Sequence, residues 1–314
     1  MTVVAVQRET RSMLLVCGAT GELGGRVARR LAAGAVGLRV LVRGELSASF
    51  VDQFDVEVVH GDLRDTASLD RAVRGVTTVV TTVTAMGRAL AGEALDVRAV
   101  DGHGTLALIH AAERAGVKRF VFVSYAGLSD PAARSFPLAA AKRAVERRLM
   151  ACGMQHVIVR PDAFQELWLS PLAGFDWSRR RVIVFGRGEA RARYVAVDDA
   201  AEAIAHWAVA DEAPGVVEFG GPEAVTRRQA ITIFEAASGR SIRTYHVPRV
   251  ALRAGMRVLR RKRPEVASVM GLSLFADLEH AHWSDEPLRA LGIRPRGVSE
   301  YAHQIVHGSE QRPL

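Results

Sequence analysis

The sequence predicts an α/β fold, a doubly wound parallel sheet with a small C-terminal substrate lobe. Three observations support this prediction: short strands that are apolar throughout, amphipathic helices that alternate with them up to about residue 162, and a glycine-rich turn between the first strand and the first helix. Strands of this kind are typical of a parallel sheet that is covered on both faces. Their alternation with helices, joined by right-handed crossovers, favours the doubly wound arrangement.

The elements of the first half repeat the same two patterns. The first strand, 13–17, runs directly into Gly18, and apolar residues then recur at helical spacing over 22–31. Gly34 ends this first helix. The further strands expected are 38–42, 56–59, 76–83, 119–123 and 157–159, and the further helices are 67–73, 95–115 and 138–150.

Beyond Pro161 the regular alternation weakens. We expect strands at 182–185 and 216–219 and a helix that opens near Asp198, followed by a mostly helical remainder. The sheet domain is expected to cover 13–162 and to continue at about 190–220, and the substrate lobe to cover 163–190 and 221–314.

Composition limits the class of protein. The chain has 314 residues, of which 49% are hydrophobic and 24% are charged, the values of an ordinary globular protein. Its two cysteines, Cys17 and Cys152, are too few for a disulfide framework or a zinc ribbon. No uncharged stretch is long enough to span a bilayer, and the N-terminal pattern is not that of a signal peptide. We therefore expect a soluble cytoplasmic protein.

The formal net charge is +8 and the sequence pI is about 10.2, which raises the question of an acidic partner. The basic residues are 39 arginines and only three lysines, whereas a dedicated nucleic-acid surface normally mixes both. The densest runs, 179–181 and 260–263, accompany no nucleic-acid-binding motif. We expect no nucleic-acid partner. The basic, amphipathic stretch 250–263 leaves contact with an anionic membrane surface open.

The glycine-rich turn has glycines at i, i+3 and i+6. The first permits a tight turn, the second lets backbone approach a pyrophosphate, and the third lets the helix pack closely on its strand. The N-terminus of the helix adds N–H groups and a partial positive charge. In this context the turn predicts a dinucleotide-binding Rossmann domain. The residues expected to contact the cofactor here are Gly18, Thr20, Gly21, Glu22, Leu23 and Gly24.

The end of the second strand indicates which nucleotide binds. NAD sites place an acidic residue there for the ribose hydroxyls, whereas a 2′-phosphate requires an arginine. The strand ends in Arg43, and the first acidic residue after it is Glu45. Because a guanidinium forms bidentate, charge-assisted hydrogen bonds with phosphate, the sequence favours NADP over NAD. The alternative is that Arg43 is one more surface arginine.

Further motifs follow the glycine turn in order and at suitable spacing. They are Val40-Leu41-Val42-Arg43, Gly61-Asp62-Leu63, 115–121, Ser124, Lys142 with Glu146, Arg160-Pro161 with Phe164, and 197–200. Together with the glycine turn they resemble the atypical short-chain dehydrogenase/reductases, specifically the NmrA-like group that includes isoflavone-reductase-like enzymes. The resemblance covers roughly residues 13–225. The remainder matches only loosely, as expected for a variable substrate lobe.

The resemblance implies further cofactor contacts. Asp62 and Leu63, after the third strand, are implied at the adenine, although Asp62 could instead stabilise a turn. Thr82 and Val83, after the fourth strand, would pass the adenosine ribose. Residues from Pro161 to Phe164, after the sixth strand, would line the nicotinamide.

The chain departs from the broader family at the usual Tyr-x-x-x-Lys pair. The lysine is present as Lys142, but Leu138 occupies the tyrosine position. Lys142 is the most informative catalytic candidate, because a lysine persists here in a chain dominated by arginine. The alternative is a surface ion pair with Glu146, four residues later on the same helix. In the resembling group some members are reductases that use the lysine, and others are dinucleotide sensors without catalysis.

Two further residues are catalytic candidates. Ser124 could hydrogen-bond a substrate carbonyl or simply cap its strand, and Tyr125 could supply the missing phenol, although adjacent strand residues point to opposite sides. Tyr194 is a more distant candidate. His280 and His282 would share one face of a strand, but no third ligand follows, so we expect no metal site.

Aromatic and large apolar residues gather just after the segment implied at the nicotinamide. They pack in the core of the lobe, or they line an apolar pocket for an aromatic, quinone or polyketide-like substrate. We expect an NADP(H)-dependent oxidoreductase that reduces a carbonyl or conjugated alkene. The alternative is a non-catalytic NADP(H) sensor or scaffold that acts through a protein partner, and a homodimer remains open. The gathered residues are Phe164, Leu167, Trp168, Phe175, Trp177 and Phe185.

Overall fold

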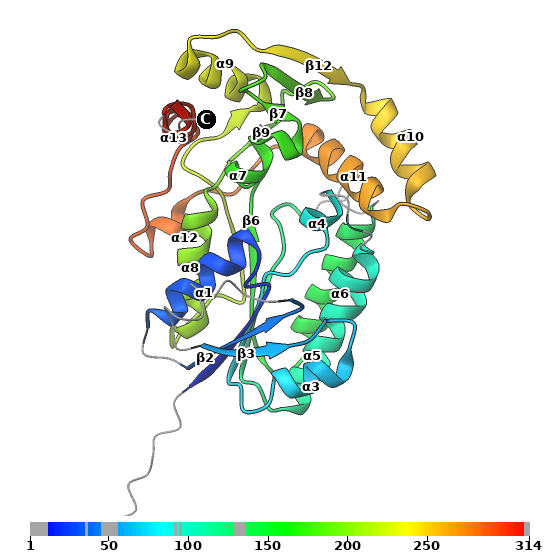
Figure 1. The fold of residues 1–314 in the computed structure, drawn as a ribbon, viewed down its shortest axis with the longest axis vertical. Helices are drawn as coiled ribbons and strands as arrows, with labels where there is room; N and C mark the ends of the chain where they lie inside the picture. The colour runs from blue at the N-terminus through cyan, green and yellow to red at the C-terminus, as the bar shows by residue number, and fades with distance from the viewer. Residues whose placement is uncertain are drawn as a thin grey trace, which may run out of the picture.

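The structure is a computed structural model that describes residues 12–34, 37–44, 56–90, 93, 96–128 and 136–310. Seven parallel strands form one sheet in the order β10-β6-β5-β4-β1-β2-β3 (Figure 1). The strand order reverses between β1 and β4, which confirms the doubly wound α/β fold. The strands are β1 (Met13–Cys17), β2 (Gly37–Val42), β3 (Val56–His60), β4 (Thr78–Thr81), β5 (Arg119–Val123), β6 (Gln155–Pro161) and β10 (Val216–Phe219).

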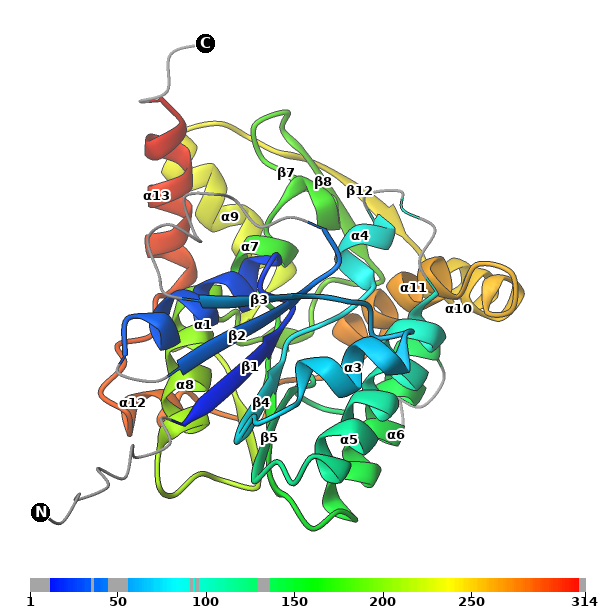
Figure 2. The same ribbon diagram turned by 60° about the horizontal axis from the view of Figure 1, so that its bottom comes forward.

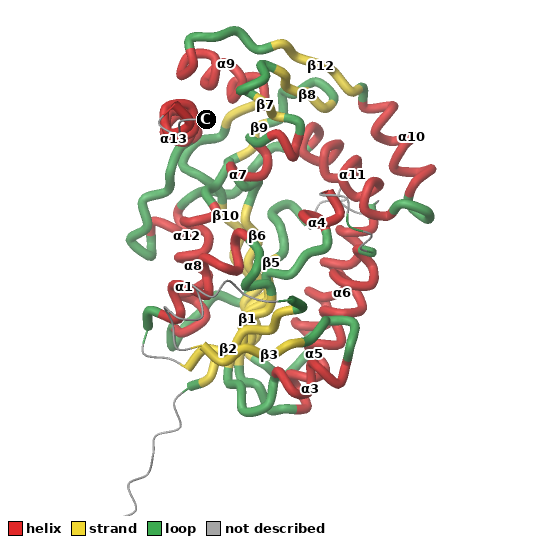
Figure 3. Tube along the Cα trace, viewed as in Figure 1, coloured by secondary structure: helices red, strands yellow, loops and turns green. Residues whose placement is uncertain are grey.

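Helices cover both faces of this sheet (Figure 3). One face packs against α1 (Glu22–Ala32) and α8 (Val197–Val209), and the other against α3 (Thr66–Ala72), α5 (Thr105–Arg114) and α6 (Pro137–Met150). Each interface has its own cluster of fully buried aliphatic side chains. Burial on both faces is why the strands are apolar along their whole length.

A smaller lobe lies across the carboxyl ends of the strands (Figure 2). It contains a three-stranded sheet of β7 (Phe175–Asp176), β8 (Arg181–Phe185) and β12 (Arg243–Val247). A two-stranded ribbon joins β9 (Arg191–Ala192) to β11 (Val225–Thr226). The helices outside the sheet layers are α4 (Met86–Leu90), α7 (Gln165–Trp168), α9 (Arg227–Ser238), α10 (Arg249–Leu259), α11 (Pro264–Leu278), α12 (Glu286–Arg289) and α13 (Val298–Glu310).

The expected helix 95–115 is not one regular helix. Leu95 lies outside the described residues, and the part that follows is a π-helical segment, η1 (Arg98–Gly104), which continues into α5. Within η1, Asp101 points into the protein and accepts a hydrogen bond from the Ala85 N–H at 2.9 Å. A Cβ atom on Gly104 would lie 2.8 Å from Leu63 Cβ, so the segment also passes close to the loop after β3. Both contacts tie this segment to the loops after β3 and β4.

Two strand predictions also need correction. The strand expected over 76–83 is limited to β4, because Thr82 and Val83 leave the sheet to form the wall of a cavity. His280 and His282 lie in the loop that links α11 to α12, not on one face of a strand. Within the described ranges, the structure has no helix that meets the length and hydrophobicity needed to span a membrane.

Candidate functional site

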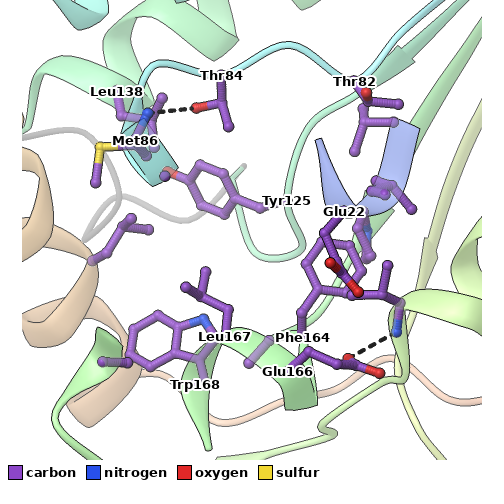
Figure 4. Close-up of a pocket in the computed structure, with 18 of the residues that line it drawn as sticks. Glu22, Thr82, Thr84, Met86, Tyr125, Leu138, Phe164, Glu166, Leu167 and Trp168 are labelled. Carbon is purple, nitrogen blue, oxygen red and sulfur yellow. Dashed lines mark hydrogen bonds between the residues drawn. The ribbon is translucent and has the colours of Figure 1, made fainter. Parts of the chain in front are cut away.

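One cavity of about 1040 Å³ follows the carboxyl edge of the central sheet, between the sheet and the lobe. Its walls come from the segments after the first six strands and from α7, β8 and α11. Figure 4 shows Glu22 and Thr82 on one side of this space and Tyr125, Leu138 and Trp168 on the other. Because doubly wound proteins bind ligands at this edge, the cavity is the candidate site.

The glycine turn forms a tight cradle at one end of the cavity. Gly18 has a φ of +98°, a conformation that L side chains rarely adopt, and its carbonyl accepts a hydrogen bond from the Gly21 N–H at 2.9 Å. A Cβ atom on Gly24 would lie only 2.2 Å from the Gly18 oxygen. No side chain caps the N-terminus of α1, so its N–H groups face the cavity without a side-chain partner. These features suit an anionic ligand such as a pyrophosphate.

The other residues of the turn also line the cavity. Thr20 and Leu23 border it on either side of Gly21. Glu22 is exposed and forms an ion pair with Arg26 at 2.6 Å, one helical turn further along α1. The neighbouring guanidinium offsets the negative charge that Glu22 would otherwise present to an anionic ligand.

Arg43 and Asp62 lie at the ends of β2 and β3, where both line the cavity. The Arg43 side chain is 36% exposed, and its guanidinium lies 4.0 Å from the Glu93 carboxylate. Asp62 accepts hydrogen bonds from the backbone and side chain of Arg64, at 2.7 to 2.9 Å. These hydrogen bonds, with a contribution from Arg43, lower the pKa of Asp62. The carboxylate therefore stabilises the turn after β3, which is the alternative that the sequence left open.

Leu63, Thr82 and Val83 complete this end of the cavity. Leu63, in the segment after β3, is buried. The Thr82 hydroxyl donates a 3.4 Å hydrogen bond to the Cys17 carbonyl, and a Cβ atom on Gly18 would lie 2.6 Å from the same hydroxyl. The glycine turn and the segment after β4 therefore touch directly.

Lys142 is buried where the cavity meets α6. Its Nζ atom donates a 2.8 Å hydrogen bond to the Val123 carbonyl and lies 4.7 Å from the centre of the Phe122 ring. Burial lowers the pKa of Lys142 below its usual value, although the nearby carboxylates oppose this effect. The surface ion pair with Glu146 is wrong, because Glu146 is itself buried and binds Arg160 at 2.7 Å.

Asp101 is a neighbour of this lysine that sequence reasoning missed. Its Oδ1 atom lies 3.9 Å from Lys142 Nζ and makes no hydrogen bond with a described residue. Burial raises the pKa of Asp101, and the charge of Lys142 opposes that rise. A π-helical turn often marks a functional position, but the regular apolar spacing of this segment gave no sign of one.

Ser124 and Tyr125 follow β5, and both line the cavity. The expectation that these two neighbouring side chains point to opposite sides therefore does not keep either of them out of the site. Two backbone hydrogen bonds hold this segment against β6. The Ser124 N–H donates to the Val159 carbonyl at 2.7 Å, and the Ala126 N–H donates to the Pro161 carbonyl at 3.0 Å. The hydroxyl groups of Ser124 and Tyr125 are buried and have no hydrogen-bond partner among the described residues.

The Tyr125 ring lies between two aromatic rings, with Phe275 at 5.9 Å and Phe136 at 6.4 Å between ring centres. Its hydroxyl points toward Met86 (Figure 4). Burial raises the pKa of Tyr125 above its usual value, so the phenol keeps its proton. Leu138 is buried in the same wall, where its side chain is apolar and offers no proton.

Tyr194 is buried in the lining of the cavity, where the neighbouring Arg227 opposes the rise that burial causes in its pKa. Arg227 donates to the carbonyl oxygens of Ile183, Trp168 and Ala173, at 2.8 to 3.0 Å. These bonds tie together three segments of the lobe. Arg227 therefore supports the shape of the cavity where it meets the lobe, beside Tyr194.

The segment after β6 contributes Pro161, Asp162 and Phe164 to the cavity. Asp162 accepts hydrogen bonds from the Arg193 N–H at 2.6 Å and from the Trp283 indole N–H at 2.9 Å. Despite these bonds, burial raises the pKa of Asp162 to about 6. One carboxyl group thus connects β6 to two separate parts of the lobe.

The gathered aromatic and apolar residues divide into two groups. Phe164, Leu167, Trp168 and Phe185 line the cavity. Phe175 and Trp177 instead pack against Phe234 in the core of the lobe. The prediction of a lobe core is therefore confirmed for Phe175 and Trp177, whereas a role of the other four residues in substrate binding stays a prediction.

A family model described as NAD(P)H-binding matches residues 18–207. The photosystem II assembly factor Ycf39 of Trieres chinensis is 30% identical over 153 residues, which is 49% of this chain and 46% of that protein. The (4-alkanoyl-5-oxo-2,5-dihydrofuran-3-yl)methyl phosphate reductase of Streptomyces griseus is 33% identical over 233 residues, 74% of this chain and 76% of that protein. The alignments with three of the curated relatives span 46%, 61% and 49% of those proteins, about half of their length.

Among solved structures, an NADPH-dependent quinone oxidoreductase of Escherichia coli in complex with NADPH has the same fold. The two chains superpose with a TM-score of 0.75 at 20% identity, over 93% of this chain and 99% of that one. At this level of identity the likeness concerns the fold alone. The comparison therefore supports the doubly wound fold of this chain.

Proposed function

We propose that this chain, which belongs to the family of NAD(P)H-binding proteins, is an NADP(H)-dependent oxidoreductase that reduces a carbonyl or conjugated alkene of an apolar substrate. One observation carries the proposal. A single cavity joins the glycine turn to Lys142 and to a wall of apolar and aromatic side chains. Such a cavity has room for a dinucleotide and for a second, apolar molecule beside it.

The residues present suit a nicotinamide dinucleotide. The cradle at Gly18 and Gly24 has no space for a side chain, and the N–H groups of α1 carry no side-chain cap. Arg43 lines the cavity at the end of β2, where a 2′-phosphate would bind, so we propose a preference for NADP(H). Asp62 and Leu63 would border the adenine, Thr82 and Val83 the ribose, and Pro161 and Phe164 the nicotinamide.

A bound NADPH would supply a hydride ion from its nicotinamide ring. We propose that Lys142, with one N–H group held by Val123, hydrogen-bonds the cofactor through another. The unpaired Ser124 hydroxyl would donate a hydrogen bond to the substrate oxygen. The unpaired Tyr125 hydroxyl would deliver the proton that completes the reduction. It would take over the role of the usual tyrosine, whose position is occupied here by Leu138.

The experiment is NADPH oxidation by the purified chain against a panel of quinones, enones and aryl ketones. Lys142→Met should lower the turnover of an accepted substrate by about 100-fold, because loss of a contact that positions the cofactor costs a factor of about this size. Arg71→Met, on the exposed surface of α3, is the matched control and should leave turnover unchanged. Full turnover in Lys142→Met would remove Lys142 from the mechanism.

A second candidate function is a dinucleotide sensor that acts through a protein partner. The buried Leu138 favours it, because no phenol occupies the usual position of the proton donor. The similarity to photosystem II assembly factors also favours it. Tight NADPH binding without turnover of any substrate in the panel would support the sensor and contradict the reductase.

A further inference from the structure

Helix α10 carries an apolar strip on the side that faces away from the protein. The helix packs on α11, where Gly255 allows close approach: a Cβ atom there would lie 2.4 Å from Met270 Sδ. Only Leu252 is fully buried in this contact. Val250 and Val258 are instead 73% and 74% exposed. With Ala254 they stand at i, i+4 and i+8, so the three side chains share one face of the helix.

The surroundings of this strip are strongly basic. Between Glu235 and Glu265 the sequence contains no acidic residue. Arg249 and Arg263 at the two ends are paired with Asp277 and Glu265. The other basic residues of α10 and the turn after it form no ion pair with a described residue. They are Arg253, Arg257, Arg260, Arg261 and Lys262, and all five are exposed.

The exposed face of α10 contributes little to the stability of the folded chain. Exposed valines lose their contact with water only when another body covers them, and unpaired arginines in a row repel one another. In both views α10 lies at the periphery of the molecule, with α11 between it and the central sheet (Figures 1 and 2). The position leaves room for a broad, flat partner.

We propose that α10 and the basic turn 260–263 dock the protein on the surface of an anionic phospholipid bilayer. The arginines would pair with lipid phosphates, and Val250, Ala254 and Val258 would enter the boundary between headgroups and acyl chains. A nucleic acid would neutralise the positive charge of the arginines but would not bury the valines. A bilayer with anionic headgroups does both.

A second cavity, of about 370 Å³, adjoins the end of α10. Arg98 lines it together with His103 and Arg260, and donates a 2.6 Å hydrogen bond to the Arg260 carbonyl. The rest of its lining is largely apolar, including Leu106 and Pro137. A cavity lined by both basic and apolar side chains suits the headgroup and upper chain of an anionic lipid.

Docking would also place the candidate site next to a lipid phase. The far side of α11 lines the large cavity with Val269, Leu272 and Phe275. An apolar substrate could then pass from the bilayer into this cavity. This consequence rests on the proposed function, whereas the docking itself does not.

The test is flotation of the full chain with vesicles of phosphatidylcholine, alone or mixed with phosphatidylglycerol. We expect binding only to the mixed vesicles, and weaker binding as salt is raised. One basic residue near an anionic surface contributes about a fivefold change in affinity, so Arg253→Gln/Arg257→Gln should bind about 25-fold more weakly. Val250→Ser/Val258→Ser should also bind more weakly. Arg71→Gln/Arg147→Gln removes the same charge from α3 and α6 and should bind like the wild type.

Equal binding to both kinds of vesicle, or an equal loss in the control variant, would overturn the proposal. Unchanged vesicle binding by the α10 variants would also overturn it. This holds even if those variants lose affinity for duplex DNA or for a second copy of the chain. NADPH binding, measured on each variant, shows that the fold is intact. Vesicle binding without reductase activity would refute the proposed function and leave the docking proposal standing.

Discussion

At the scale of residues, Lys142 and Asp101 form a buried pair whose Nζ and Oδ1 atoms lie 3.9 Å apart. The lysine has one hydrogen-bond acceptor in Val123, and the aspartate accepts from the Ala85 N–H beside the Thr84 side chain. Because burial disfavours both charges, each group makes the other's ionised form less costly. We therefore predict that Asp101 is a positioning residue, which favours the charged form of Lys142 and holds the segment after β4 through the Ala85 N–H.

Asp101→Asn tests this role. The amide oxygen of asparagine can still accept from Ala85, but the negative charge that raises the pKa of Lys142 is lost. If the ammonium form is required, the alkaline limb of the kcat/KM profile should move to lower pH. The profile is measured against that of Asp70→Asn, which removes an exposed carboxylate paired with Arg114. An alkaline limb at the wild-type position would contradict the assigned role.

Asp162 predicts an unusual dependence of stability on pH. Its pKa is raised from 3.8 to about 6, so the folded protein binds its proton more tightly than the unfolded chain does. The stabilisation is complete below pH 3.8 and is lost as the pH rises through about 6, a change of about 3 kcal/mol. In urea unfolding, the free energy of unfolding of the wild type should exceed that of Asp162→Asn by an amount that falls as the pH rises over this range. Asp176→Asn is the control, since the pKa of Asp176 is lowered and the residue stays ionised there.

At the scale of elements, the glycine turn and α1 form one unit with the segment after β4. Gly24→Ala would place a methyl group 2.2 Å from the Gly18 oxygen and 2.5 Å from the Thr82 hydroxyl. We expect it to destabilise the fold by about 1–3 kcal/mol and to abolish NADPH binding, measured by thermal unfolding and by fluorescence titration. Gly153→Ala meets no atom within 4 Å and should change neither. Normal NADPH binding by Gly24→Ala would show that the cradle does not hold the cofactor.

The elements also show what the sequence could predict and why. Strands such as β1 and β5 were predictable because burial on both faces makes them apolar throughout. The edge strand β12 was missed, since its residues 243–246 are exposed and polar enough to resemble a loop. The π-helical η1 was missed because its residues carry no sequence signal that separates a π-helix from an α-helix. The hydrogen bonds of Asp162 depend on distant residues that only the tertiary fold brings together.

At the scale of the whole molecule, the candidate site is the junction of two units. The sheet supplies the glycine turn and the strand ends, and the lobe supplies α7, β8 and α11. Several side chains bridge the two, and Asp162 is one of them through its bonds to Arg193 and Trp283. A ligand that fills the cavity would contact both units and so stabilise the molecule as a whole.

Thermal unfolding with each cofactor tests this junction and the specificity of Arg43 together. A ligand that binds only the folded state, at about 100 times its dissociation constant, adds about 2.7 kcal/mol to the free energy of unfolding. NADPH should therefore raise the Tm more than NADH at equal concentration, because a charge-assisted hydrogen bond to the 2′-phosphate contributes about 1.5–3 kcal/mol. Arg43→Ala should bring the two shifts together, while Arg71→Ala should preserve the difference. If the preference survives in Arg43→Ala but is lost in Arg64→Ala, the phosphate lies instead over the turn that Asp62 and Arg64 form after β3.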